Sequence, residues 1–230
     1  MMNKEGNSYT LVYASIVVIL VAVALAFVSQ TLRPQQAKNE AIDKMQQILG
    51  SLHVTTTGAN AEMEYKKLIT DSYVVNVKGE KIEGDAFVTE PAEELNKPES
   101  ERKYPVYEAM IDGKKKYILS MRGTGLWGPI WGFMALNDDK NTVYGASFGH
   151  AGETPGLGAE IDKPAFGKEF IGKKFFNHEG QFVSIAIVKP GKIAQGKDYV
   201  DGISGGTITS QGVDAMLSNS IGAYHEFLKK

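Results

Sequence analysis

The chain has 230 residues, no cysteine and a formal net charge of −2 at pH 7, with 25 Lys and Arg against 27 Asp and Glu. Because the two signs are nearly balanced and mixed along the chain, the composition argues against a nucleic-acid-binding protein, which would concentrate Lys and Arg on one face. The lack of cysteine excludes iron–sulfur ligation, thioether haem attachment, a lipoprotein anchor, disulfides and a thiol nucleophile.

An uncharged segment near the N-terminus predicts a single transmembrane helix. No residue from 6 to 32 carries a charge, and a helix over residues 9–32 measures about 36 Å at 1.5 Å per residue, enough to cross a bilayer. A cleaved signal peptide is the alternative, since the Ala-Leu-Ala at 24–26 forms a small-x-small cleavage site. The weak positive region, Lys4 beside Glu5, favours a retained anchor.

The charges around this segment do not fix its orientation. Arg33, Lys38 and Lys44 follow the span and only Lys4 precedes it, so the positive-inside rule taken literally places the large domain in the cytoplasm. That rule weakens for long translocated domains, and 198 residues follow position 32. The sequence therefore predicts three parts: a short tail at 1–8, a transmembrane helix at 9–32 and a domain at 33–230.

The segment after the span predicts an α+β domain with an antiparallel sheet. Helical composition over 37–52 and 59–69 indicates a stalk and a packed helix. Runs rich in β-branched and aromatic residues, separated by tight turns, predict strands, and the Asp-Gly at 112–113 is a strong hairpin signal. The predicted strands cover 73–77, 104–111, 116–121, 130–136, 143–148 and 182–188. The fold class is thus one anchor followed by an α+β domain with packed helices.

Two further segments have a clear pattern. The polar, proline-containing stretch at 89–103 predicts a surface excursion, with Glu90, Glu93 and Glu94 on a solvated face. Apolar residues recur at steps of three and four over 208–228, which predicts one amphipathic helix that packs on the domain.

A glycine-rich turn leads into this last helix and predicts an anion site. Residues 201–210 read Asp-Gly-Ile-Ser-Gly-Gly-Thr-Ile-Thr-Ser, so small and hydroxyl residues meet the positive end of the helix and its free N–H groups. Phosphate suits such a turn best. The alternative is a Ser or Thr helix cap, which is the commoner outcome from spacing alone.

A second glycine-rich loop precedes that turn, at residues 149–160. Its Pro155-Gly156 turn exposes Thr154 and the amides of Leu157 and Gly158, groups suited to the polar edge of a heterocycle. A long glycine-rich hairpin loop without a ligand is the alternative.

Other chemistry is either absent or weakly indicated. Trp127 and Trp131 could form an aromatic wall for a flat ligand, although a pair of core tryptophans is more common. The four histidines are scattered, so we expect no metal centre. Neither a G-x-S-x-G elbow nor a G-x-G-x-x-G helix start occurs, so serine-hydrolase and dinucleotide sites lack their motifs.

The N-terminal span, GETPGLG at 152–158 and DGISGGTITS at 201–210 together resemble one family along the whole chain, the C subunits of the sodium-pumping NADH:quinone oxidoreductase. The resemblance implies FMN bonded through its phosphate to a threonine hydroxyl, attached by a flavin transferase that consumes FAD and needs magnesium. It also implies partner subunits in a membrane redox complex, within which the flavin relays electrons one at a time.

The family's D-x-x-S-G-A-T pattern assigns residues in this sequence. It places the acceptor threonine on Thr207, the aspartate on Asp201 and the serine on Ser204. Gly206 replaces the family's alanine, and we expect flavin attachment to survive the loss of one methyl group. The implied cofactor-binding residues are Asp201, Ser204, Gly205, Gly206, Thr207, Ile208, Thr209 and Ser210 in the turn, and Glu153, Thr154, Gly156, Leu157 and Gly158 in the loop.

The loop residues are expected to border the isoalloxazine, with Thr154, Leu157 and Gly158 in direct contact. The N–H groups of Ile208, Thr209 and Ser210 are expected to bond the phosphate. We expect no catalytic side chain and no metal ligand in this chain.

The family further implies a single-pass protein of the bacterial inner membrane, with the large domain on the periplasmic side. Two alternatives remain from the sequence. One is the related G subunit of the Rnf ferredoxin:NAD oxidoreductase, which shares the flavin-binding domain and the anchor. The other is a membrane-tethered binding or scaffolding module without a cofactor, whose glycine turn is only a helix cap.

Overall fold

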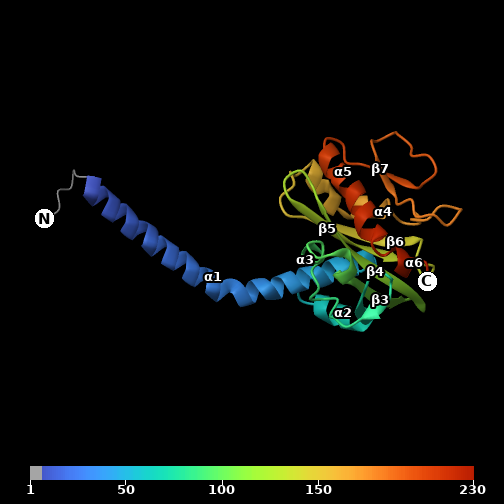
Figure 1. The fold of residues 1–230 in the computed structure, drawn as a ribbon, viewed down its shortest axis with the longest axis horizontal. Helices are drawn as coiled ribbons and strands as arrows, with labels where there is room; N and C mark the ends of the chain where they lie inside the picture. Colours follow the sequence, from blue (N-terminus) through green and yellow to red (C-terminus); the bar gives the residue numbers. More distant parts are fainter. Residues whose placement is uncertain (1–6) are drawn as a thin grey trace. The chain divides into compact units, whose positions relative to one another are not determined.

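The computed structural model describes residues 7–230, so most of the tail predicted at 1–8 lies outside the described residues. The described chain begins with a helix of 45 residues, α1 (Asn7–Ser51), which continues through Pro34 (Figure 1). Proline removes one backbone donor and disfavours a helix interior, yet the chain stays helical here. The segments predicted at 9–32 and 37–52 are therefore parts of one helix, and no break separates the span from a stalk.

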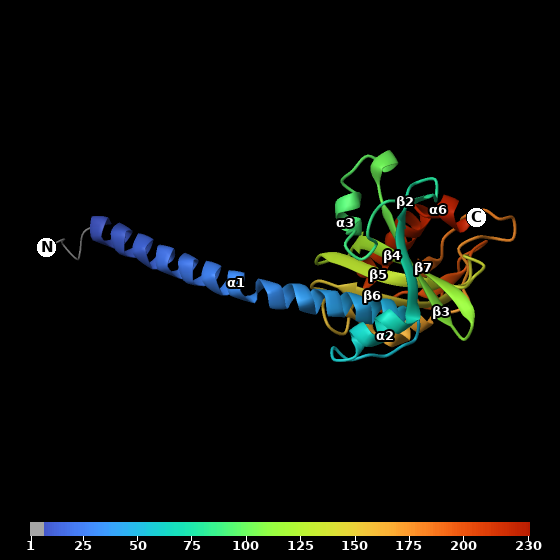
Figure 2. The same ribbon diagram turned by 90° about the horizontal axis from the view of Figure 1, so that it is seen from below.

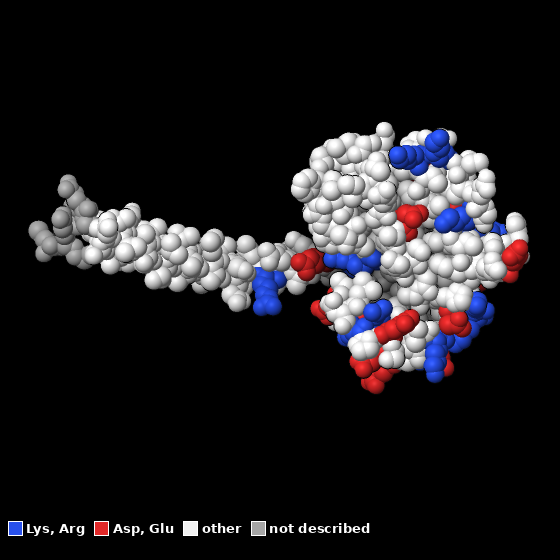
Figure 3. Space-filling view, turned by 45° about the horizontal axis from the view of Figure 1, so that its top comes forward, with Lys and Arg blue, Asp and Glu red and all other residues white. Residues whose placement is uncertain are grey.

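The chain divides within α1 into two compact units, and the first ends at Asp43. Its apolar side chains are exposed, and an 18-residue stretch has a mean hydropathy of 3.0 with none of it buried. The helix is therefore long and apolar enough to cross a membrane, a test that a signal sequence near the N-terminus also passes. Figure 3 shows this helix without charged side chains along most of its length, whereas charges of both signs are mixed on the second unit.

The second unit, Lys44–Lys230, is built on a six-stranded antiparallel sheet with the order β2-β1-β3-β4-β5-β6. The predicted hairpin joins β3 to β4, and both of its turn residues, Asp112 and Gly113, have positive φ (50° and 72°), as a type I′ turn requires. The strands are β1 (Ile69–Val75), β2 (Lys81–Ile82), β3 (Tyr104–Ile111), β4 (Lys114–Thr124), β5 (Pro129–Leu136) and β6 (Val143–His150).

Side chains alternate between the two faces of the sheet along each strand, so both faces carry apolar side chains that need cover. Helices pack on both faces. On one face, Ile48 and Leu52 at the end of α1 pack with Phe133, and α2 (Ala61–Leu68) lies beside them. On the other face, Val213 and Met216 of the C-terminal helical segment join a larger buried cluster. Figures 1 and 2 show the sheet between these two layers. The predicted α+β class is confirmed.

The C-terminal helical segment is not the single helix predicted over 208–228. It consists of α5 (Thr207–Met216), a π-helical turn η3 (Leu217–Ile221) and α6 (His225–Leu228). The buried side chains nevertheless follow the predicted apolar face. They are Val213, Met216, Leu217, Ile221, Tyr224 and Leu228.

The remaining elements connect the sheet to these helices. The strand predicted at 182–188 is shorter, and it pairs in parallel with a strand that the local sequence pattern did not predict. This pair matters for the site because its second strand ends at Asp201, where the glycine-rich turn that leads into α5 begins. The elements are α3 (Pro91–Glu94), η1 (Glu99–Glu101), η2 (Gly158–Asp162), α4 (Pro164–Lys168), β7 (Ala186–Val188) and β8 (Tyr199–Asp201).

The predicted surface excursion at 89–103 contains α3 and η1, but its glutamates do not all face solvent. Glu94 is only 7% exposed. It pairs with Lys97 at 2.7 Å and accepts the N–H of Lys103 at 2.9 Å. The prediction of a solvated face is therefore wrong for Glu94, because the short helix turns this side chain back toward the excursion's own backbone.

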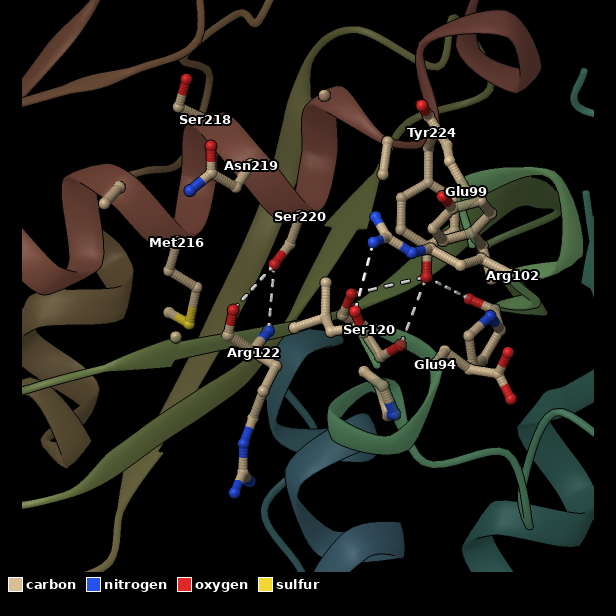
Figure 4. A pocket seen from close by; sticks show the side chains of 18 of the residues that line it. Glu94, Glu99, Arg102, Ser120, Arg122, Met216, Ser218, Asn219, Ser220 and Tyr224 are labelled. Atoms are coloured by element: carbon tan, nitrogen blue, oxygen red, sulfur yellow. Dashed lines mark hydrogen bonds between the residues drawn. The ribbon is translucent and has the colours of Figure 1, made fainter. Parts of the chain in front are cut away.

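The pairing of β3 with β4 ends at Val106 and Leu119. Past this pair, side chains of the C-terminal segment bond the backbones of the two strands. Ser220 Oγ accepts the N–H of Arg122 at 3.1 Å and donates to its carbonyl at 3.0 Å. The hydroxyl of Tyr224 donates to the carbonyl of Pro105 at 2.8 Å. Figure 4 shows both residues beside a cavity of about 700 Å³ between the excursion, β4 and the helical segment. These bonds satisfy backbone groups that an unpaired strand edge would leave exposed.

We expect Tyr224→Phe to lower the stability of the second unit by about 1–2 kcal/mol, because the buried carbonyl of Pro105 loses its donor. Tyr224 is 2% exposed, and its burial raises the pKa of the hydroxyl, which stays protonated as a donor. Thermal unfolding measures the change. Tyr144→Phe is the matched control, since Tyr144 is half-buried and its ring, which the variant keeps, makes the contacts with His53 and Lys116. Equal unfolding temperatures for the two variants would contradict this account.

Candidate functional site

The glycine-rich turn connects β8 to α5 and leaves the start of the helix open. Asp201 is the last residue of β8, and Thr207 is the first residue of α5. The N-cap residue is Gly206, and no side chain caps the helix. Gly205 has a φ of +75°, a conformation that glycine adopts without strain. The Ser or Thr cap considered for this turn is therefore not formed.

The first N–H groups of α5 are free to bind an anion. The N–H of Gly206 donates to the carbonyl of Ile203 at 3.0 Å, and that of Ser210 donates to the carbonyl of Gly206 at 2.9 Å. The N–H groups of Thr207, Ile208 and Thr209 have no hydrogen bond among the residues that the structure describes. The Ser210 N–H, also predicted to bond the phosphate, already donates to the carbonyl of Gly206 and is not free in the structure.

The loop at 153–158 packs directly on this turn. A Cβ on Gly205 would lie 2.6 Å from Cδ2 of Leu157, and one on Gly206 would lie 3.2 Å from the nitrogen of Gly158. The two motifs found in the sequence therefore form one site, although about 50 residues separate them. The N–H of Leu157 was predicted to face a heterocycle. In the structure it donates to the carbonyl of Thr154 at 3.1 Å and is not free.

A buried carboxylate connects this loop with two other segments. Glu153 is 4% exposed, and its Oε2 accepts the hydroxyl of Thr209 at 2.5 Å. Its Oε1 accepts the backbone N–H of Trp127 at 2.8 Å. The side chain of Glu153 is therefore enclosed by the protein, with each carboxylate oxygen bonded to another segment of the site. It holds together three segments of the site.

The polar residues predicted for the turn divide into exposed and buried groups. Asp201, Ser204, Thr207 and, in the loop, Thr154 and Gly156 are exposed. Thr209 and Ser210 are buried, and Ser210 Oγ accepts the N–H of Ile203 at 2.9 Å. These two hydroxyls support the turn rather than face a ligand.

Exposed apolar side chains surround the open helix start. They come from the three segments that Glu153 and the glycines hold together, and Trp127 is the most exposed of them at 67%. Large apolar groups in such positions mark a surface that binds a ligand or a partner. The four side chains are Leu126, Trp127, Leu157 and Ile208.

Trp131 does not join Trp127 in an aromatic wall. Its Nε1 donates to Gln47 Oε1 of α1 at 2.8 Å, and its ring packs closely over Gly149. The cavity of about 700 Å³ is also separate from the site, because the described residues that line it include none of those predicted for the cofactor. The candidate site is therefore an open surface at the start of α5.

Comparisons with known proteins agree with this location. The family model of the FMN-binding domain matches residues 125–222, which include all three segments of the site. The C subunit of the Na(+)-translocating NADH-quinone reductase from Haemophilus ducreyi is 33% identical over 229 residues, covering 92% of this chain and 88% of that protein. The chain belongs to this family of C subunits. The Pseudomonas aeruginosa member is 32% identical over 94% of this chain and 92% of its own length.

Solved structures of the family share the fold. The crystal structure of the C subunit from Parabacteroides distasonis has a TM-score of 0.82 and 54% identity, covering 86% of this chain and 98% of that one. NqrC from Shewanella oneidensis has a TM-score of 0.68 at 24% identity, covering 83% and 99%. The family predicted from the two motifs is confirmed, and an FMN-binding domain is the assignment for the region around the open helix start.

The described residues fit the group that this family model names. FMN carries a phosphate, which the three free N–H groups at the start of α5 can bind. It also carries a flat ring, for which the exposed apolar side chains offer contact area. The hydrogen bonds of Glu153 and the close packing at Gly205 and Gly206 hold together the segments that carry these N–H groups and apolar side chains. The sequence motifs identify these residues but not the hydrogen bond from Thr209 to Glu153, because no local pattern links positions 56 apart.

Proposed function

We propose that the chain carries FMN in a phosphoester to Thr207 Oγ1 and serves as a flavoprotein subunit of a sodium-translocating NADH:quinone oxidoreductase. One observation carries the attachment. Thr207 is an exposed hydroxyl residue at the first position of a helix without a cap, beside three free N–H groups. A phosphate bonded to this residue stays within the positive end of the helix.

The attachment transfers a flavin phosphate from FAD to this hydroxyl. Thr207 Oγ1 forms the bond to the phosphorus of the FMN half, the phosphoanhydride bond breaks, AMP leaves and the hydroxyl proton is released. The reaction needs a flavin transferase and magnesium. In the product, the N–H groups of Thr207, Ile208 and Thr209 bind the remaining phosphate charge. Gly206, which stands where the family pattern has alanine, suits this turn, because a Cβ there would lie 3.2 Å from the nitrogen of Gly158 and from Cβ of Ile203.

FMN supplies the redox chemistry when it is bound, and the chain's residues place it. Thr154 and Gly158 lie in the loop that packs on the turn, and the apolar side chains of Leu157 and Ile208 lie beside the attachment residue. An exposed site suits electron exchange with other subunits of the complex. Those subunits, the flavin transferase and the lipid bilayer are the proposed partners.

The proposed localisation is the bacterial inner membrane, with a tail at 1–8, a span at 9–32 and a periplasmic domain at 33–230. It is supported by the exposed apolar surface of α1 and by the hydropathy of its 18-residue stretch. Since the chain has no cysteine, single cysteines can report the orientation. A membrane-impermeant maleimide should label Glu179→Cys in cells with a permeabilised outer membrane and Ser8→Cys only after lysis.

We expect residues 9–32 to remain in the mature protein and to cross the membrane once. Sequencing the mature N-terminus and extraction of washed membranes measure this. A retained start and release only by detergent are the expected results. A mature chain that begins just after Ala26 would instead establish cleavage as a signal peptide.

The cofactor is tested by producing the protein with and without its flavin transferase. The intact mass should rise by one FMN less one water only with the transferase, and the acid-precipitated protein should then keep its flavin absorbance. A membrane-tethered scaffold without a cofactor predicts the same mass in both cases.

A further inference from the structure

Glu153 is one of two buried glutamates among the described residues, and its carboxylate is bonded to Thr209, near the proposed attachment residue in α5. Its two oxygens accept one hydrogen bond each from segments far apart in the sequence, the hydroxyl of Thr209 and the N–H of Trp127. Thr209 is two residues after Thr207, in the first turn of α5. The carboxylate therefore lies at the same helix end that would bind the flavin phosphate.

Two glycines enclose this carboxylate. A Cβ on Gly125 would lie 2.5 Å from Glu153 Oε1, and a Cβ on Gly158 would lie 2.5 Å from Oε2. Neither position could hold a side chain without displacing the carboxylate. The loop at 125–128, the loop at 153–158 and the start of α5 are consequently built around one glutamate.

No Lys, Arg or His side chain forms an ion pair with Glu153 within the described part of the chain. The backbone N–H of Glu153 donates to Nδ1 of His150 at 3.2 Å, and Nε2 of His150 lies 3.6 Å from Oδ2 of Asp162. The partners that stabilise the carboxylate are two neutral donors and the positive end of α5. Its negative charge is thus not cancelled by a cation at the site.

We propose that Glu153 is a positioning residue that joins the three segments of the flavin site and places a fixed negative charge beside the flavin, which lowers its reduction potential. This inference rests on the proposed attachment of FMN at Thr207. Two-electron reduction of the flavin with uptake of one proton leaves one negative charge on the ring. A nearby buried carboxylate disfavours that charge, because the Coulomb interaction is weakly screened away from bulk water.

Three variants separate the charge of Glu153 from its shape. Glu153→Gln keeps the length of the side chain and removes the charge. Glu153→Asp keeps the charge but shortens the reach to Thr209 and Trp127. Glu94→Gln is the matched control, since Glu94 is also buried but bonds Lys97 and Lys103 in the excursion.

The first measurement uses the unmodified full chain in detergent, so it does not depend on the flavin. Hydrogen exchange should report faster exchange of the Trp127 amide, by about tenfold, in Glu153→Asp, because the shorter side chain moves the acceptor away from this N–H. Glu153→Gln keeps an amide oxygen at the same reach and should change the exchange less. Glu94→Gln should leave this amide unchanged. An unchanged Trp127 amide in Glu153→Asp would overturn the positioning role.

The second measurement is a redox titration of the flavin-loaded proteins. In Glu153→Gln the ratio of reduced to oxidised flavin at a fixed potential should rise about tenfold, which is about 30 mV for a two-electron couple. Glu153→Asp should shift it less than Glu153→Gln does, and Glu94→Gln should not shift it. A wild-type potential in a fully loaded Glu153→Gln protein would overturn the electrostatic role. Failure of the wild-type chain to take up FMN from its transferase would instead contradict the proposed function, while the exchange result would still stand.

Discussion

Thr207→Ala protein, produced together with the flavin transferase, is expected to carry no covalent flavin. The variant loses the hydroxyl oxygen that forms the phosphoester, while the backbone of the turn and the free N–H groups of α5 remain. Because Thr207 is exposed and its side chain has no hydrogen bond among the described residues, the fold should be retained within about 0.5 kcal/mol. Intact mass and the flavin absorbance of acid-precipitated protein give the result, which should be a complete loss.

Two controls identify the reason for this loss. Thr207→Ser retains a hydroxyl at the same position and should restore at least part of the flavin. Thr154→Ala removes another exposed threonine hydroxyl, in the loop that packs on the turn, and should keep the wild-type mass. Covalent flavin on the Thr207→Ala protein would place the attachment at another residue. Wild-type protein made in the same cells shows that the transferase is active.

The local elements could be predicted where sequence neighbours decide the structure. The Asp112-Gly113 hairpin formed because both residues adopt positive φ. The face of the C-terminal segment formed as predicted because burial of Val213, Met216 and Tyr224 follows from their spacing. The π-helical turn was missed, since one inserted residue per turn leaves the apolar spacing nearly unchanged.

Elements that depend on distant contacts could not be predicted in the same way. β8 is only three residues long and forms through its parallel pairing with β7. Glu94 lies in a polar stretch whose composition indicates exposure, yet its bonds to Lys97 and Lys103 bury it. In both cases the deciding partner is set by the fold of the chain rather than by the local pattern.

The candidate site shows the same division between local and distant information. The turn at 201–210 and the loop at 152–158 were each found from residue types. That they pack together, with Leu157 on Gly205, could not be derived from either segment. The role of Glu153 needed the structure as well, because a glutamate in a loop is usually exposed. Its burial explains why glycine stands at positions 125 and 158.

Gly158→Val is expected to lower the stability of the second unit by about 3 kcal/mol. A Cβ at this position would meet Thr209 Oγ1 and lie 2.5 Å from Glu153 Oε2. Overpacking at a buried position such as Gly158 costs about 1–3 kcal/mol, and loss of a buried hydrogen bond to a charged group adds to it. For a domain of this size the unfolding temperature should fall by about 6–12 °C. Thr207 remains exposed, so flavin attachment should persist with a changed absorption spectrum.

Gly152→Ala is the matched control within the same loop. Beyond its two chain neighbours, no atom of the described residues lies within 4 Å of the Cβ that this substitution would add, and Gly152 is not among the glycines with positive φ. Its unfolding temperature and flavin spectrum should therefore match those of the wild type. If Gly158→Val behaved like Gly152→Ala in both measurements, the contact between this glycine and the pair formed by Glu153 and Thr209 would not be needed. The ring would then be bordered by another segment of the site, such as the loop that carries Trp127.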